Sequence, residues 1–402
     1  MWIYIIYGVT NLMGGYAFVY QSFMLTSLGY GFLLMFKIKN ANILDACIFI
    51  YFLYFIFNAL LIDYPRHETF LVYALVYQFS PFMFYFIARS NELELEVVLK
   101  KMMIPITIAM VFGLYCYITE PEWYMAIKWA WINDVYGQYV TDRNVIEKMR
   151  LTSFWDSSYY MAFSTLFYSA YLMFSLVFKD LQRRRRILYY ILLGICVLVL
   201  TFGQHRVCLF AFVLIYVFCI IKVRDIKRRT VLLIGAGIIG TVFIILVSTS
   251  PEYYEYVMSR LQSATSEEGI NERFEHTGGG QDLLSLFGDG YGSHSLRARD
   301  FNGWAIIDNQ YQNVLGELGI VGFVLFVLIL LISTALGLIG RRKTRMELFI
   351  LFFYLVAFFG SSPLIVVSEY SFLFWYTLGK ISQKSVIVKN TYAPSIRYYS
   401  PS

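Results

Sequence analysis

Charged residues are scarce in this sequence. Asp, Glu, Lys and Arg make up 15% of the 402 residues, while 58% are hydrophobic. Soluble globular domains are nearer to about half apolar and about a quarter charged, so this balance excludes an ordinary soluble domain. The formal net charge of +6 does not indicate a nucleic-acid partner, because the basic residues are spread through short loops between apolar runs.

Several common functional motifs are also missing. The sequence has no zinc-ligand spacing, no phosphate-binding glycine loop, no serine-nucleophile elbow and no internal repeat, so we expect neither a bound metal nor a cofactor. The five cysteines all fall inside apolar segments, where cysteine is typical of a small core residue and does not predict a disulfide. They are Cys47, Cys116, Cys196, Cys208 and Cys219.

Long apolar runs dominate the chain instead. Each is long enough to cross the roughly 30 Å of membrane hydrocarbon as a helix, whereas a spanning barrel would show short alternating segments. We therefore expect an all-α, polytopic transmembrane domain over residues 1–383 and a polar tail without structure over 384–402. About twelve spans are predicted, near 2–18, 20–36, 42–61, 70–88, 102–118, 157–178, 187–201, 207–222, 231–249, 312–339, 346–360 and 364–380.

The basic residues predict the orientation of these spans. With a cytoplasmic N-terminus and twelve spans, every basic cluster falls on the cytoplasmic side, which is the usual bias of short loops in membrane proteins. We therefore expect a bacterial inner-membrane protein with both termini in the cytoplasm. The clusters are Lys37/Lys39, Arg89/Lys100/Lys101, Lys179 with Arg183–Arg186, Lys222–Arg229, Arg341–Arg345 and Lys380/Lys384.

Two predicted outer segments are more than connectors. Residues 119–156 are rich in tryptophan and tyrosine, which favours an aromatic belt at the membrane surface over stacking on sugars. Residues 251–306 are polar and punctuated by glycine, and a loop of this length is usually functional. We predict that this second segment is a large periplasmic loop.

Arginine is the commonest basic residue on the predicted outer side. Its planar guanidinium grips phosphate oxygens in pairs, which lysine cannot do. The alternative is that these arginines are merely solvated loop charges. Arg206 differs because it begins an apolar run, where a cation must snorkel or find a partner. The ten outer basic residues are Arg66, Lys128, Arg143, Lys148, Arg150, Arg206, Arg260, Arg273, Arg297 and Arg299.

Five short segments, in this order and around the large loop, resemble the bacterial O-antigen polymerase (Wzy-type) and O-antigen ligase superfamily. The resemblance covers about residues 150–340, and the first third of the chain matches in topology alone. The segments are 150–156 (RLTSFWD), 203–207 (GQHRV), 271–273 (NER), 287–292 (FGDGYG) and 308–322 (DNQYQNVLGELGIVG). Ligases commonly carry histidine before the asparagine of the last segment, and Asp308 at that position favours the polymerase branch.

The resemblance implies a glycosyltransferase of lipopolysaccharide or other polysaccharide biosynthesis. A growing glycan on undecaprenyl pyrophosphate would move onto a hydroxyl of a new lipid-linked repeat unit, at the periplasmic face. One displacement without a metal would invert the anomeric centre. The implied partners are lipid-linked glycans, membrane lipid and a protein that regulates chain length. An O-antigen ligase and a flippase for the lipid-linked unit are the rival readings.

Such a reaction needs a proton acceptor for the attacking hydroxyl and cations for the departing pyrophosphate. The candidates for proton transfer are Asp308, His294 and Glu317, while His205, His276 and Asp289 are weaker. The candidates for binding pyrophosphate or sugar are Arg150, Arg206, Arg260, Arg273, Arg297, Arg299 and Asn309.

Structural roles compete with these assignments. Asp308, followed by Asn309, could instead cap the helix that begins near Gln310. Glu317 lies nine residues after Asp308, about two and a half helical turns, so it could share a face with Asp308 or simply support packing. A loop histidine such as His294 is more often solvated than catalytic.

Overall fold

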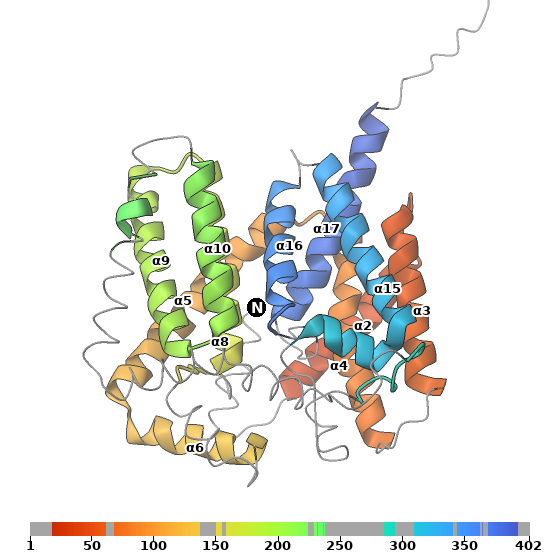
Figure 1. Cartoon of the computed structure of the whole chain (residues 1–402), viewed down its shortest axis with the longest axis horizontal. Helices are drawn as coiled ribbons and strands as arrows, with labels where there is room; N and C mark the ends of the chain where they lie inside the picture. Colours follow the sequence, from red (N-terminus) through yellow and green to blue (C-terminus); the bar gives the residue numbers. More distant parts are fainter. Residues whose placement is uncertain are drawn as a thin grey trace, which may run out of the picture.

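The structure is a computed structural model, and it describes residues 18–61, 68–136, 150–154, 158–223, 229–230, 232–235, 237, 285–293, 309–340, 344–361, 364 and 369–392. Within these ranges the regular structure is helical throughout, without a strand, which confirms the prediction of an all-α fold (Figure 1). The helices are α2 (Phe18–Met35), α3 (Ile43–Leu61), α4 (Glu68–Ser90), α5 (Leu95–Thr119), α6 (Glu122–Tyr136), α8 (Ser158–Phe178), α9 (Arg183–Gly203), α10 (Arg206–Lys222), α15 (Gln310–Ile339), α16 (Arg345–Ala357) and α17 (Glu369–Tyr392).

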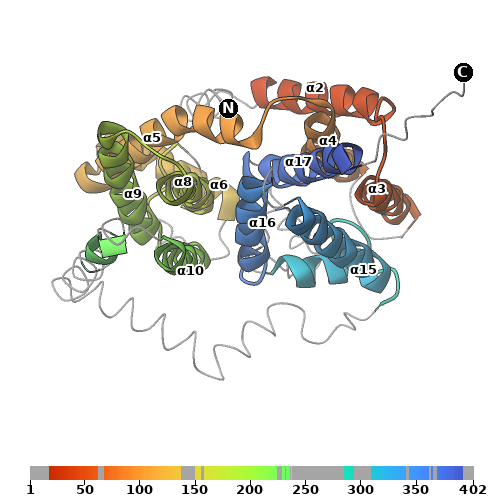
Figure 2. The same ribbon diagram turned by 90° about the horizontal axis from the view of Figure 1, so that it is seen from above.

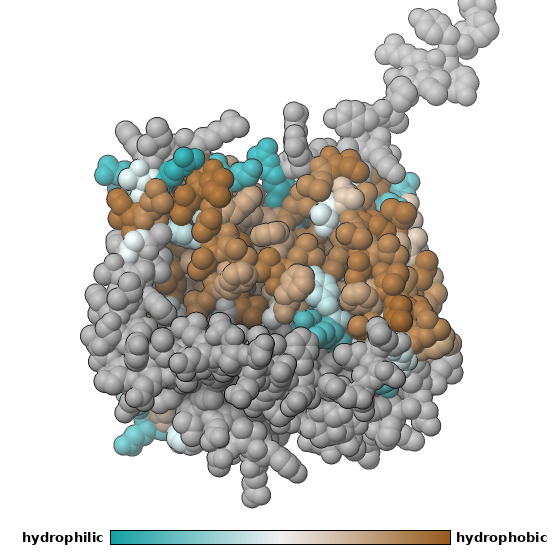
Figure 3. Space-filling model, in the orientation of Figure 1, coloured by the Kyte–Doolittle hydropathy of each residue, from teal (hydrophilic) through white to brown (hydrophobic). Residues whose placement is uncertain are grey.

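Several of these helices can cross a membrane. Among the described residues, five helices are long and apolar enough to do so, with spans at Ile43–Leu60, Leu95–Thr119, Ser158–Phe178, Arg183–Gly203 and Gln310–Ile339. Shorter apolar stretches occupy Ser22–Met35 and Val207–Lys222. A band of hydrophobic side chains runs across these helices in Figure 3, with hydrophilic residues above it. Nearly all of the predicted span 2–18, and most of 231–249, lie outside the described residues.

Helix α8 is the most enclosed of these helices. Every residue from Met161 to Leu176 is buried, and α9, α10 and α5 pack around it (Figure 2). Its sequence places Ser164, Ser169 and Ala170 among large aromatic residues. Small side chains let neighbouring backbones approach closely, which is how helices pack where burial from water supplies no driving force.

Described residues of the basic clusters meet at one end of the bundle, which we call the basic end. There the buried guanidinium of Arg89 pairs with Asp45 at 3.2 Å and ties α4 to α3. Lys384 of α17 pairs with Glu347 at 2.8 Å and with Glu94 at 2.6 Å. These contacts bring helix ends that are distant in the sequence together.

The opposite end carries the connections, and we call it the loop end. Residues 150–154, 204–205, 285–293 and 361 lie there, together with α6, which runs across the end of the bundle (Figure 1). Helix α6 falls within the predicted outer segment 119–156, where no helix was expected. Its Trp123 and Trp129 are exposed, which fits the aromatic belt at a membrane surface.

Two helices, α17 and α15, differ from the simple pattern that the sequence predicts. The polar tail was expected to be without structure from Lys384, but α17 continues to Tyr392 because Lys384 and Ser385 still pack against neighbouring helices. Helix α15 is not one straight span, since Gly319 has φ 66° and ψ −170° inside it. The segment before Gly319 therefore turns across the loop end, and the segment after it crosses the bundle (Figure 1).

Candidate functional site

Two glycines from separate motifs press against each other at the loop end. A Cβ atom on Gly319 would lie 2.3 Å from the backbone nitrogen of Gly288, and one on Gly288 would lie 2.5 Å from that of Gly319. Both have positive φ, 66° and 77°, a conformation that side chains other than glycine rarely adopt. Gly288 of the FGDGYG segment and Gly319 of the GELG segment therefore allow two stretches of backbone to approach each other closely.

Backbone hydrogen bonds fix the 285–293 loop on the break in α15. The N–H of Asp289 donates to Gly316 O at 2.8 Å, and that of Gly290 donates to Glu317 O at 3.2 Å. From the other side, Ile320 N–H donates to Ser285 O at 3.0 Å and Val321 N–H to Leu286 O at 3.2 Å. The broken helix and the loop thus satisfy each other's polar backbone groups, which burial would otherwise leave unpaired.

We call this contact between the 285–293 loop and the break in α15 the glycine joint. Two side chains of helix α3 also form hydrogen bonds to it. The Asn58 side-chain amide is fully buried and donates to Phe287 O at 2.7 Å and to Glu317 O at 3.3 Å. The Tyr54 hydroxyl donates to Leu318 O at 2.6 Å. These bonds hold Glu317 in place through its backbone, which leaves its carboxylate to face a cavity.

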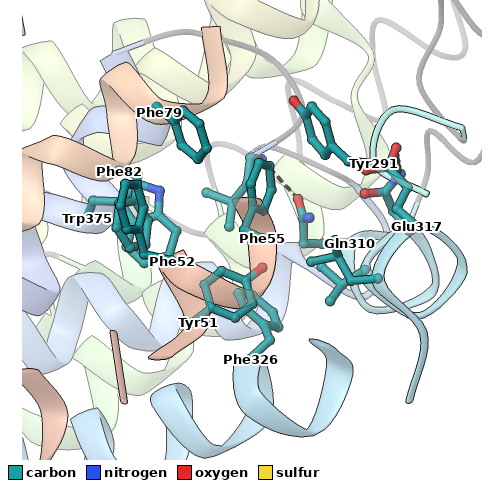
Figure 4. Close-up of a pocket in the computed structure, with 14 residues that line it drawn as sticks. Tyr51, Phe52, Phe55, Phe79, Phe82, Tyr291, Gln310, Glu317, Phe326 and Trp375 are labelled. Atoms are coloured by element: carbon teal, nitrogen blue, oxygen red, sulfur yellow. Dashed lines mark hydrogen bonds between the residues drawn. The ribbon is translucent and has the colours of Figure 1, made fainter. Parts of the chain in front are cut away.

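The cavity lies between α3, α4, α17, the 285–293 loop and the first segment of α15 (Figure 4). About 50 Å³ of it can hold water-sized molecules, which is space for three to five waters at about 10–15 Å³ each. One wall is polar and the rest is largely aromatic. The lining residues that matter below are Phe55, Tyr291, Gln310, Asn313, Glu317 and Trp375.

The polar wall comes from one face of α15. Gln310, Asn313 and Glu317 follow each other at intervals of three and four residues, so their side chains line one side of the helix. Each is buried. The Gln310 side-chain oxygen accepts from Leu364 N–H at 3.0 Å. The Asn313 amide donates to the Glu317 carboxylate at 3.4 Å, a long and therefore weak hydrogen bond.

A chain of contacts connects this wall to the hairpin between α9 and α10. The Gln310 N–H donates to Ser361 O at 3.1 Å, and the Ser361 hydroxyl bonds the Tyr159 hydroxyl. The Tyr159 ring meets the His205 ring edge-on, with centroids 5.6 Å apart. His205 Nε2 in turn bonds the Ser158 hydroxyl at 2.9 Å. The GQHR and DNQ segments, about 100 residues apart, therefore meet at the loop end.

Asn309 performs the capping role that the sequence offered to the Asp308–Asn309 pair. Its side-chain oxygen accepts from Tyr311 N–H at 3.0 Å and from Gln312 N–H at 3.1 Å, so it satisfies two of the unpaired donors of the first helical turn. Its side-chain amide nitrogen donates to Phe359 O at 3.4 Å, so both ends of the carboxamide contact the protein.

Most of the other predicted site residues cannot be placed. Arg206 begins α10 beside His205, but its side chain is outside the described part of the structure. The remaining ones lie outside the described residues altogether and keep their status as predictions. They are Asp308, His294, Arg260, Arg273, Arg297 and Arg299.

Arg150 lies in a second, smaller pocket under α6. It shares that pocket with Lys128 and Tyr124, and none of its lining residues also lines the cavity at Glu317. Lys128 is buried and its ammonium donates to Arg150 O at 2.5 Å. Burial raises the pKa of the Tyr124 phenol, so it stays protonated and donates to Ser153 O at 3.0 Å. These contacts anchor α6 on the 150–154 segment.

Sequence reasoning nominated Glu317 but missed the residues around it. The regular spacing of Gln310, Asn313 and Glu317 could have pointed to a polar face on an otherwise apolar helix. No local signal pointed to Phe55, and Tyr291 stands in the 287–292 segment without having been proposed as a site residue. The rings of these two residues lie 4.4 Å apart although they are distant in the sequence. Searches against models of known protein families and against curated proteins found no match to this chain.

Proposed function

We propose that this chain is a bacterial inner-membrane glycosyltransferase of the O-antigen polymerase type. It has about twelve spans, both termini in the cytoplasm, and a large periplasmic loop over about 251–306. It transfers a growing glycan from undecaprenyl pyrophosphate onto a lipid-linked repeat unit at the periplasmic face.

One observation supports the proposal above all. Four of the family-like segments are joined by contacts at the loop end, away from the basic clusters. Leu151 N–H donates to Phe202 O at 3.1 Å beside the GQHR hairpin, His205 contacts Ser158 and Tyr159, and the 285–293 loop binds the break in α15. Two of these segments, 287–292 and 308–322, also line the cavity that holds Glu317.

The chemistry of the reaction fits this end of the molecule. The glycosidic bond forms as the acceptor hydroxyl attacks the anomeric carbon, and the bond from that carbon to the pyrophosphate oxygen breaks. The hydroxyl proton passes to a carboxylate or imidazole, for which Glu317, Asp308 and His294 are the candidates. Pyrophosphate leaves as a stable anion, so arginines such as Arg206 and Arg273 suffice to meet its charge.

The distribution of buried charge favours an enzyme over the rival flippase. Transporters commonly bury charged residues midway through their spans. Among the described residues, the buried charged side chains lie toward one or other end of the bundle and not at its middle. They are Asp45, Arg89, Lys128, Glu317, Glu347 and Lys380.

Deleting the gene tests the reaction class in cells. Loss of a polymerase leaves lipid A core carrying a single repeat unit, loss of a ligase leaves core with none, and loss of a flippase leaves the repeat unit on the cytoplasmic side. Core with a single repeat is the expected result, and either other outcome overturns the proposal.

Arginine variants then test whether Arg206 and Arg273 bind the departing pyrophosphate, an arrangement that we call the pyrophosphate clamp. Arg206→Ala and Arg273→Ala are expected to abolish or strongly reduce polymer while the protein still inserts, and the lysine variants are expected to rescue it only partly, because lysine lacks the paired donors of arginine. Arg183→Ala, at the basic end, is the matched control and is expected to polymerise normally. If both loop-end alanine variants give full-length polymer ladders, the proposal that Arg206 and Arg273 bind the pyrophosphate is wrong.

A further inference from the structure

Two buried carboxamides carry unused hydrogen-bonding groups into the cavity. Gln310 and Asn313 are each 3% exposed and both line the cavity. The Gln310 Nε2 group donates to none of the described residues, and the Asn313 Oδ1 atom accepts from none of them. Both groups face a cavity with space for water, so water can satisfy them in the free protein, and a ligand that enters can replace that water by supplying the same hydrogen bonds.

The cavity therefore presents a donor, a neutral acceptor and a carboxylate on one helical face. Gln310 offers N–H, Asn313 offers a carbonyl oxygen, and Glu317 offers carboxylate oxygens. A hydroxyl both donates and accepts a hydrogen bond, so neighbouring hydroxyl groups on one ligand can satisfy all three side chains. A simple apolar ligand would satisfy none of them.

The aromatic part of the lining suits an apolar ring face. Phe55 and Tyr291 lie with their centroids 4.4 Å apart and their planes tilted by 53° (Figure 4), and Phe79 meets Phe55 at 5.2 Å. A sugar ring has hydroxyl groups at its edge and C–H groups on its faces. The combination of aromatic walls with a few placed polar groups is typical of sites that orient a small ligand.

Charge narrows the class of ligand further. Glu317 is acidic, and none of the described lining residues is basic. Among the described lining residues a phosphate or a sugar carboxylate would find no cation, whereas hydroxyl groups would find three hydrogen-bonding side chains. The cavity is also small, so it admits the hydroxyl-bearing edge of a sugar while the ring remains at its mouth.

From these observations we infer that the cavity at Gln310, Asn313 and Glu317 is the acceptor subsite, and that it binds an uncharged sugar at the end of the lipid-linked repeat unit. The Phe55–Tyr291 pair packs against the ring face, and the attacking hydroxyl points toward Glu317. The pyrophosphate of the donor binds elsewhere. This inference rests on the proposed function for the identity of the acceptor.

A lipid-free acceptor separates the two substrates experimentally. The repeat unit is extracted from cells that lack this chain, and mild acid releases its oligosaccharide from the lipid pyrophosphate. The free oligosaccharide can accept a glycan but cannot donate one. Its KM is measured with purified full-length protein at a fixed concentration of lipid-linked donor, and its direct binding is followed by the fluorescence of Trp375, which lines the cavity.

Asn313→Leu is the test variant, because leucine keeps the approximate volume and removes the acceptor oxygen. We expect it to raise the KM for the free oligosaccharide about 2–10-fold, the effect of one lost neutral hydrogen bond, with the KM for the donor unchanged. Gln312→Leu is the matched control: Gln312 is the adjacent residue and does not line the cavity. Equal melting temperatures of the three proteins show that folding is unaffected.

The outcomes distinguish the two proposals. An unchanged acceptor KM in Asn313→Leu, or a raised donor KM instead, overturns the acceptor subsite. If the wild-type protein binds the free oligosaccharide through the fluorescence of Trp375 but makes no polymer, the subsite stands and the proposed polymerase fails. If Trp375→Phe leaves the fluorescence change intact, the oligosaccharide binds outside this cavity and the inference is wrong.

Discussion

Replacing Gly319 by alanine tests the joint that holds the candidate site together. Its φ of 66° with ψ of −170° belongs to a region that is essentially restricted to glycine and costs other residues roughly 1–3 kcal/mol. The added Cβ would also lie 2.3 Å from the backbone nitrogen of Gly288. Because backbone cannot rotate out of the way as a flexible side chain does, the 285–293 loop must move.

The expected loss follows from the bonds that this movement breaks. Four backbone hydrogen bonds join the loop to α15, and each contributes about 0.5–1.5 kcal/mol, or roughly 2–6 kcal/mol together. If the joint stays closed, Gly319→Ala keeps these bonds but costs the backbone strain of roughly 1–3 kcal/mol and the overlap with Gly288; if the joint opens, the cost is the roughly 2–6 kcal/mol of the lost hydrogen bonds. The loop is therefore expected to detach locally while the remaining helices keep their packing.

Hydrogen exchange of the purified protein measures this directly. We expect faster exchange at Asp289, Gly290, Ile320 and Val321 in Gly319→Ala, together with loss of polymerisation. Gly194→Ala is the control, because a Cβ there meets no atom within 4 Å. Unchanged protection of the four amides in Gly319→Ala would refute the glycine joint.

Three further predictions concern stability and topology. Asn309→Ala is expected to lower the free energy of unfolding by about 1 kcal/mol through loss of the cap, whereas an Asp at the same position keeps it; equal losses in chemical denaturation would contradict the capping role. Arg89→Met leaves the buried Asp45 carboxylate without its cation and should cost about 3–5 kcal/mol, seen as a lower melting temperature in detergent; an unchanged temperature would show that the pair is dispensable. A reporter fused after Ala264 should be active in the periplasm and one fused after Arg228 in the cytoplasm; cytoplasmic activity from the first fusion overturns the orientation.

The sequence predicted individual helices well and their ends less well. The spans expected near 102–118 and 157–178 correspond to α5 and α8, because a continuous apolar run in a membrane must satisfy its backbone groups within itself. That rule does not apply at the membrane surface. Helix α6 was missed for this reason, since its charged and aromatic residues resemble an interfacial loop in composition.

The candidate site was predictable only in part. Glu317 was nominated from its motif, and the structure places it in the cavity wall. Asp308 and Asn309 were considered together for the helix cap, and a cap depends on which side-chain oxygen reaches the first N–H groups, a matter of dihedral angles that composition does not reveal. The structure shows that Asn309 holds this position.

The sequence by itself determined that this protein is helical and built for a membrane, because hydrophobicity and span length are properties of consecutive residues. Tertiary structure alone decided which polar residues meet. Asn58 reaches Phe287 across 229 positions of the chain, and Gly288 faces Gly319 because two backbones pass within the space that a side chain would fill. Such contacts depend on how the helices pack against each other, and no local pattern encodes that packing.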